Sequence, residues 1–170
     1  MGKSKLDRRR FLGSALAVSA TAGCSKKAAP LLSEGEMRTL AAICDQMIPP
    51  DQDPGGAWAG VPNYISRQLR GPFKEHFEAY RAGIAAADRR AGGNFAALSR
   101  EQQLDVLNAM DRDKTTRNFI SLVAAHSAQG YYGNPRHGGN RDYCSWRMLG
   151  VPASPVRGHD QYDLTKGGRS

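Results

Sequence analysis

The placing of residues that start and end helices is the feature of this 170-residue sequence that most limits its fold. Between residues 33 and 129 apolar residues recur at steps of three and four, and no run alternates apolar with polar residues as a half-buried strand does. Ser33 and Glu36 form a capping box at the start of the first helical stretch, and Ser99 and Gln102 repeat it later. The pattern predicts an all-α fold: about five helices in one small domain over residues 33–150.

Proline and glycine mark the expected helix ends. Pro49 and Pro50 end the first helix, Pro62 opens the second within its first turn, and Gly92 stops a third that begins near Phe73. A fifth helix is expected over residues 115–129. The residues expected on the buried faces are Met37, Leu40, Cys44, Met47, Ile48, Tyr64, Ile65, Leu69, Phe73, His76, Phe77, Tyr80, Ile84, Leu104, Leu107, Met110, Phe119, Leu122, Val123 and His126. Beyond them comes a long irregular C-terminal segment rich in Gly and aromatic residues, ending in an extended tail over residues 151–170.

The first 23 residues have the layout of an export signal, a basic start followed by a short run of small apolar residues. That apolar run, residues 11–22, is too short for a membrane span of roughly 20 residues. The basic part resembles the twin-arginine signal, whose route carries proteins that are already folded. The residues that carry this resemblance are Arg8, Arg9, Phe11 and Leu12. We therefore expect passage through the twin-arginine translocase, with residues 24–32 as a linker.

Cys24 follows Thr21, Ala22 and Gly23 in a stretch that resembles a lipobox, in which the cysteine becomes the lipidated first residue. Two outcomes stay open at this point: lipidation of Cys24, or ordinary cleavage nearby. Only more than one acyl chain would give stable anchoring.

The net charge of +8 divides evenly between the first 23 residues and the rest of the sequence. Residues 1–23 hold five of the 24 Lys and Arg residues and one of the 16 Asp and Glu residues, so +4 belongs to this segment and +4 to the rest. No DNA- or RNA-binding motif occurs, and we expect no nucleic-acid partner.

Two cysteines, Cys44 and Cys144, lie outside the signal segment. In an oxidising periplasm they could form a disulfide that closes a loop of about 100 residues. Two separately buried thiols, or a bond to a partner chain, are the alternatives.

The sequence lacks the motifs of a reaction centre, and we predict no catalytic, cofactor-binding or metal-binding residue. It has no dinucleotide-binding glycine motif, no c-type haem attachment motif and too few cysteines for an iron–sulfur cluster. His76 and His126 lie on apolar stripes, which favours core histidines bonded to a neighbour over ligands of zinc or haem. Asp51 and Asp53 fit a solvated turn better than a calcium loop.

The segment "GYYGNPRHGGNRDYCSW", residues 130–146, combines tight turns with side chains that dominate protein interfaces. With the residues after it, this segment resembles the signature of the gluconate 2-dehydrogenase subunit 3 family. The matching residues are Gly130, Tyr131, Pro135, Gly138, Gly139, Asn140, Arg141, Asp142, Trp146, Arg147, Leu149, Gly150 and Pro152. A second stretch, residues 40–65, resembles the acidic, glycine-rich loop of the same family.

The resemblance implies a small, non-catalytic subunit of a dehydrogenase that oxidises sugars, sugar acids or polyols. The large partner would be an FAD-dependent subunit of the glucose-methanol-choline type, and a multihaem cytochrome c would be a further partner. The small subunit would help assembly and lend its twin-arginine signal to the flavin subunit. The complex would lie in the periplasm, on the outer face of the inner membrane, attached through partners or a lipid on Cys24.

Within this interpretation six residues are expected to support the partner interface or the turn geometry that it needs: Tyr131, Tyr132, His137, Asn140, Arg141 and Trp146. Two alternatives remain. One is a free-standing periplasmic lipoprotein that binds a ligand or partner, and the other is a metal- or haem-dependent enzyme that uses His76 or His126.

Overall fold

The computed structural model describes residues 30–152, 162–163 and 168–169. Within the first range all regular secondary structure is helical, which confirms the all-α prediction. Its α-helices are α1 Glu34–Met47, α2 Val61–Gln68, α3 Phe77–Arg90, α4 Arg100–Arg112, α5 Arg117–Tyr132 and α6 Cys144–Met148. Short 3-10 turns join them: η1 Lys74–His76, η2 Phe95–Ala97, η3 Pro135–His137 and η4 Arg141–Tyr143. Two two-residue strands, β1 Tyr162–Asp163 and β2 Gly168–Arg169, pair antiparallel.

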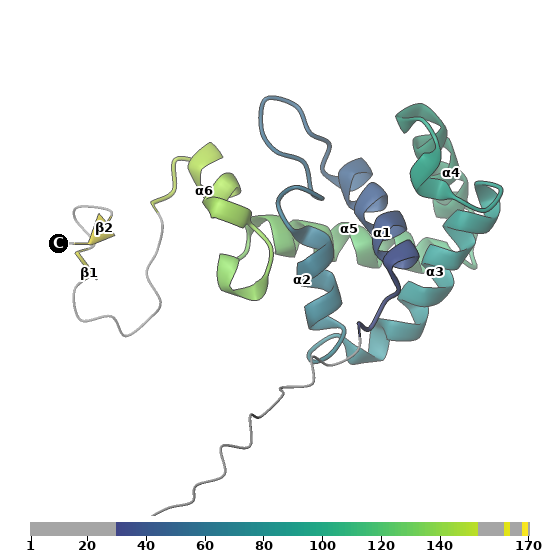
Figure 1. The fold of residues 1–170 in the computed structure, drawn as a ribbon, viewed down its shortest axis with the longest axis horizontal. Coiled ribbons are helices and arrows are strands. Elements are labelled where there is room, and N and C mark those ends of the chain that lie inside the picture. The colour runs from purple at the N-terminus through teal and green to yellow at the C-terminus, as the bar shows by residue number, and fades with distance from the viewer. Residues whose placement is uncertain (1–29, 153–161, 164–167, 170) are drawn as a thin grey trace, which may run out of the picture.

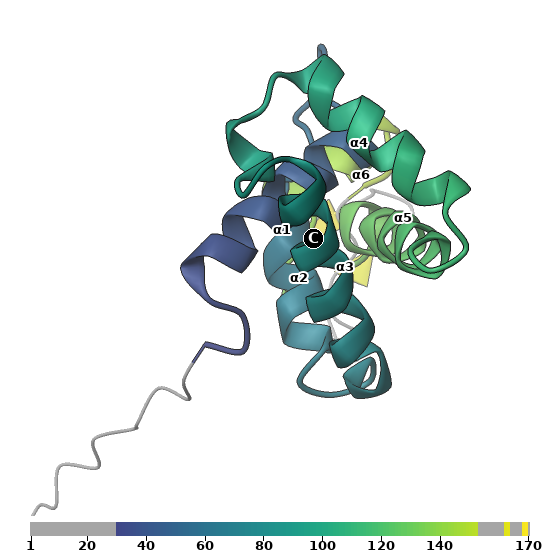
Figure 2. The same cartoon turned by 90° about the vertical axis from the view of Figure 1, so that its right-hand side faces the viewer.

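Helix α5 is the central element, since it contacts α1, α2, α3, α4 and α6 (Figures 1 and 2). Aliphatic and aromatic side chains from all the longer helices meet around it. Full burial of each stabilises the fold by about 1.5–3 kcal/mol. Fully buried members include Leu40, Ile43, Ile65, Tyr80, Ile84, Phe95, Met110 and Val123.

The predicted starts of α1, α2 and α4 are confirmed. Ser33 Oγ accepts a hydrogen bond from the Glu36 amide at 3.2 Å, and the Glu36 carboxylate accepts from the Ser33 amide at 2.8 Å. Ser99 and Gln102 form the same reciprocal pair at α4. Pro62 lies in the first turn of α2.

Four expectations need correction. The third helix does not begin near Phe73: residues 74–76 form η1, and α3 starts only at Phe77. Leu104, expected in the core, is 49% exposed, because it lies at the open side of a hollow between α4, α1 and α5, beside Met47 and Ile120. Helix α5 continues past residue 129 to Tyr132, and α6 follows where an irregular segment was expected.

No helix among the described residues combines the length and the hydrophobicity needed to cross a membrane. The predictions for Arg8, Arg9, Phe11, Leu12 and Cys24, and for most of the tail, fall outside the described residues.

Candidate functional site

The two stretches that carry the family resemblance lie against each other. The backbone amide of Arg141 donates to the Ala59 carbonyl at 2.9 Å, and the Tyr131 hydroxyl donates to the Pro54 carbonyl at 2.7 Å. The loop over residues 49–60 is therefore bonded directly to the segment over residues 130–152. We call these two stretches the joined segments; they occupy the end of the molecule that carries α6 (Figure 1).

Glycines allow this close approach. A Cβ atom on Gly139 would lie 2.1 Å from the Gly130 carbonyl oxygen, and one on Gly130 would lie 2.7 Å from the ring of Tyr64. A Cβ atom on Gly60, whose φ is +82°, would lie 2.7 Å from the Gly138 carbonyl oxygen. Only glycine combines this missing volume with a left-handed backbone.

Left-handed backbone also occurs at three residues that are not glycine. Asn140, Asp142 and Tyr143 have φ values of 45°, 53° and 57°. Each such residue costs roughly 1–2 kcal/mol relative to an ordinary conformation. A conformation of this cost persists only where surrounding contacts hold it, and such residues gather at functional sites.

Asn140 supplies those contacts. Its side chain is fully buried, its Nδ2 donates to the Gly133 carbonyl at 2.9 Å, and its Oδ1 accepts from the Ser145 amide at 3.0 Å. The Cys144 thiol donates weakly to the same Oδ1 at 3.6 Å. One amide side chain thus connects the end of α5 to the start of α6.

Side chains of α6 also satisfy the last carbonyls of α5, which have no partner within their own helix. Ser145 Oγ donates to the Tyr131 carbonyl at 2.6 Å, and Trp146 Nε1 donates to the Tyr132 carbonyl at 2.8 Å. Trp146 therefore has an internal role besides any contact with a partner.

The six predicted interface residues separate into two groups. Tyr131 and Asn140 are buried: Tyr131 bonds the two joined segments to each other, and Asn140 holds the turns within residues 133–145. Tyr132, His137 and Arg141 are exposed, and Trp146 is half-buried. Burial raises the pKa of the Tyr131 phenol to about 12, so this hydroxyl remains a donor at neutral pH.

Of the exposed apolar residues at this end, sequence reasoning predicted only Tyr132 as an interface residue. Seven large hydrophobic residues are exposed among the described residues, and six of them belong to the joined segments: Trp58, Tyr132, Tyr143, Met148, Leu149 and Val151. Exposed apolar side chains concentrated in one region mark interaction sites. The signal was present in the sequence as Met148, Leu149 and Val151, directly after the aromatic stretch.

Cys44 and Cys144 are both buried and both free. In this structure no bond joins the two thiols, and each lies beside its own neighbour, Ser127 or Asn140; the disulfide stays a prediction. The Cys44 thiol lies 3.8 Å from Ser127 Oγ, and burial raises its pKa to about 12. Neither thiol has the exposed, electropositive surroundings that make a cysteine reactive.

His126 is the core histidine that the sequence favoured. Its Nδ1 lies 2.9 Å from the Tyr80 hydroxyl, and the Phe73 ring stacks on its imidazole at 4.0 Å. The side chain of His76 lies beside it, with ring centroids 5.6 Å apart, but remains about one-third exposed. No group of three or more metal-ligating side chains comes together within the described part of the chain.

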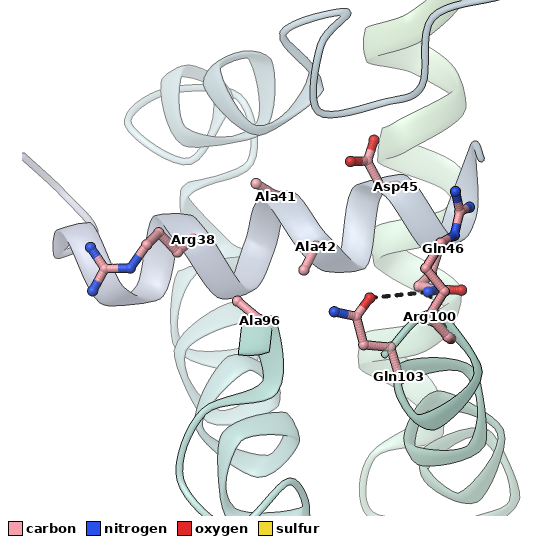
Figure 3. Close-up of a pocket in the computed structure, with 8 residues that line it drawn as sticks. All are labelled: Arg38, Ala41, Ala42, Asp45, Gln46, Ala96, Arg100 and Gln103. Carbon is pink, nitrogen blue, oxygen red and sulfur yellow. Dashed lines mark hydrogen bonds between the residues drawn. The ribbon is translucent and has the colours of Figure 1, made fainter. Parts of the chain in front are cut away.

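A hollow of about 410 Å³ lies between α1, η2 and the start of α4 (Figure 3). Alanines and polar side chains line it. Gln46 Nε2 donates to the Arg100 carbonyl and to Gln103 Oε1, both at 3.0 Å. Asp45 Oδ1 accepts from the Ala57 amide. These groups bond with the fold itself, and the arrangement contains no nucleophile paired with a base.

Comparisons with known proteins agree with the resemblance. The family model described as "Gluconate 2-dehydrogenase subunit 3" matches residues 34–152, which include both joined segments. Comparison with curated proteins gives no match, and comparison with solved structures gives none either.

Proposed function

Since this chain belongs to the gluconate 2-dehydrogenase subunit 3 family, we propose that it is a non-catalytic subunit that docks on a flavin-bearing catalytic subunit and helps to assemble the complex. The observation that carries the proposal is the concentration of exposed apolar residues on the joined segments. A protein surface of this kind gains stability when a partner covers it. The costly backbone of residues 140–143 supports the same reading, because it presents these side chains in one fixed arrangement.

A charge substitution within the apolar surface tests docking. Leu149→Glu places a carboxylate at a residue that is 57% exposed, and Leu104→Glu does the same on α4 at 49% exposure. Leu149→Glu is expected to abolish co-purification with the catalytic subunit, whose flavin absorbance identifies it. Leu104→Glu should leave recovery unchanged. Equal recovery for both variants would contradict docking through the joined segments.

The proposal extends to export. An FAD protein acquires its cofactor in the cytoplasm, so it has to cross the inner membrane folded, and a subunit with a twin-arginine signal would provide that route. The catalytic subunit would then act on CH–OH groups of sugars, sugar acids or polyols at the periplasmic face of the inner membrane. A multihaem cytochrome c would receive the electrons.

Lysine substitutions test the export role. The variant Arg8→Lys with Arg9→Lys should leave dehydrogenase activity in the cytoplasmic fraction. Arg10→Lys is the matched control, since it changes the neighbouring arginine outside the pair and should leave activity in the periplasm. Periplasmic activity in the double variant would show that the catalytic subunit is exported independently of these arginines.

A further inference from the structure

The joined segments carry three arginines for which the described part of the chain provides no carboxylate partner. Arg136, Arg141 and Arg147 form no ion pair among the described residues, whereas Arg38, Arg81 and Arg90 elsewhere in the fold each have one. Asp142 is the single acidic residue between residues 130 and 152. The stretch over residues 130–152 therefore carries a formal charge of +2, from three arginines and one aspartate, besides its apolar side chains.

The neighbouring loop adds two acidic residues, Asp51 and Asp53, but neither forms an ion pair with these arginines among the described residues. Asp51 Oδ1 accepts a hydrogen bond from the Asp53 amide at 2.8 Å, within a turn of the loop. Both carboxylates raise the pKa of the Tyr131 phenol slightly, which places them near that hydroxyl. No ion pair joins either of them to an arginine in the described part of the chain.

Arg141 is the best positioned of the three arginines. Its backbone amide is bonded to Ala59, and its guanidinium lies over the Trp58 ring at 5.3 Å from the ring centroid. A guanidinium that stacks through its face keeps its in-plane N–H donors available. Carboxylates are the groups that match this planar donor fork. Arg141 is thus held in place by both joined segments, while its guanidinium forms no ion pair with any described residue.

Arg136 and Arg67 extend the basic surface. Arg136 Nε donates to His137 Nε2 at 3.0 Å, which leaves its terminal nitrogens available. Arg67, exposed on α2, packs its stem beside Gly138 and has no ion pair among the described residues. Basic side chains therefore flank the Gly138–Gly139 turn on several sides.

We propose that the joined segments recognise an acidic, apolar face of the catalytic subunit, with a partner carboxylate bound to the guanidinium of Arg141 where it stacks on Trp58. This inference rests on the proposed docking function and adds the chemistry of the partner's surface. Arginine and tryptophan are the residues most often found at the centres of interfaces, and a desolvated charge pair there makes binding specific and salt-dependent. The fixed left-handed backbone favours a protein over an anionic membrane, because a fluid lipid surface requires no such precise arrangement.

The test measures the affinity of the full chain for the flavin-bearing catalytic subunit at low and at high NaCl concentration. The wild-type affinity should fall as salt increases. Arg141→Glu should weaken binding by about a hundredfold or more at low salt, since it breaks the pair and adds a like charge. Arg112→Glu is the matched control: it reverses an exposed charge on α4, at the opposite end of the molecule from α6 (Figure 1), and should change binding less than twofold.

A charge-swap experiment separates recognition from folding. Arg141→Glu should unfold at the wild-type temperature, and Arg141→Ala, which introduces no new charge, should also weaken binding. Replacing acidic residues of the catalytic subunit by arginine, one at a time, should identify one that restores binding to the Arg141→Glu subunit. The absence of any rescue would overturn the proposed carboxylate contact.

Three further outcomes separate this inference from the docking function on which it rests and from binding to a membrane. If the affinity did not depend on salt and Arg141→Glu bound as tightly as Arg112→Glu, the proposal of an acidic face on the catalytic subunit would be wrong. The docking function would still stand. Failure of the wild-type chain to bind the catalytic subunit would overturn docking itself. Binding of the chain to vesicles of anionic phospholipid, lost in Arg141→Glu while binding to the catalytic subunit persists, would assign the arginines to a membrane surface and overturn the inference.

Discussion

At the scale of single residues, Asn140 has the largest structural role relative to its size. Its buried amide holds both a carbonyl at the end of α5 and an amide at the start of α6. It does so from a left-handed backbone that asparagine tolerates better than most residues do. The arrangement of the whole segment over residues 133–145 therefore depends on one side chain.

Asn140→Ala removes both hydrogen bonds and leaves a buried carbonyl and a buried amide without partners. The unfolding free energy should fall by about 3 kcal/mol, since each buried group left unpaired costs roughly 1–3 kcal/mol. Asn134→Ala, which removes one bond at a half-buried site, should cost less than about 1 kcal/mol. Urea unfolding followed by circular dichroism measures both, and equal losses would contradict the role of Asn140.

His126 predicts a pH dependence of stability. Burial, and then the neighbouring His76, lower the pKa of its imidazole below the ordinary value of 6.5. The unfolded chain therefore binds a proton more readily than the folded chain, and stability rises with pH across this range. The contribution of His126 to the unfolding free energy should be complete above about pH 6.5. It should decrease as the pH falls toward the lower pKa of the folded state.

His126→Gln provides the comparison, because glutamine does not titrate and can still accept a hydrogen bond from Tyr80. The decrease in urea midpoint between neutral and mildly acidic pH should be smaller in this variant than in the wild type. Parallel pH curves for the two proteins would exclude His126 as the source.

At the scale of helices, the sequence was informative wherever local chemistry determines an end. Both capping boxes and the proline in the first turn of α2 could be predicted because each depends on residues within one turn of the other. The start of α3, the last turn of α5 and the whole of α6 could not. These depend on contacts with distant segments, such as the bonds from α6 side chains to the carbonyls of Tyr131 and Tyr132.

The same reason explains the mixed outcome for the candidate site. Aromatic and glycine-rich composition identified residues 130–146, but composition does not reveal which side chains point inward. Tyr131 and Asn140 are internal because they bond to the backbone at Pro54, Gly133 and Ser145. The bond to Pro54 spans 77 residues and leaves no local pattern in the sequence.

Replacement of either capping serine tests the contribution of the helix starts. Ser33→Ala and Ser99→Ala should each lower the unfolding free energy by about 1 kcal/mol, because helix-start amides lose their side-chain acceptors. Ser121→Ala, at an exposed site within α5, should cause no loss. A stability for Ser99→Ala equal to that of Ser121→Ala would mean that this cap adds nothing measurable.

At the scale of the whole molecule, the described core is assembled from residues 32–144. We therefore expect the chain that begins at Cys24 to unfold at the same temperature as the full chain, with the same cooperativity in a thermal scan. It should bind the catalytic subunit equally well and fail only to bring it across the membrane. A lower unfolding temperature for the shortened chain would show that residues 1–23 take part in the fold.

The bond between the Tyr131 hydroxyl and the Pro54 carbonyl has a consequence for how such chains diverge. The backbone bond from the Arg141 amide to the Ala59 carbonyl joins the same two stretches, so neither can change length or shape separately. Across relatives they should vary in concert. A chimera that takes residues 49–60 from another member of the family should be less stable than either parent. Taking residues 130–152 from the same relative should restore the stability.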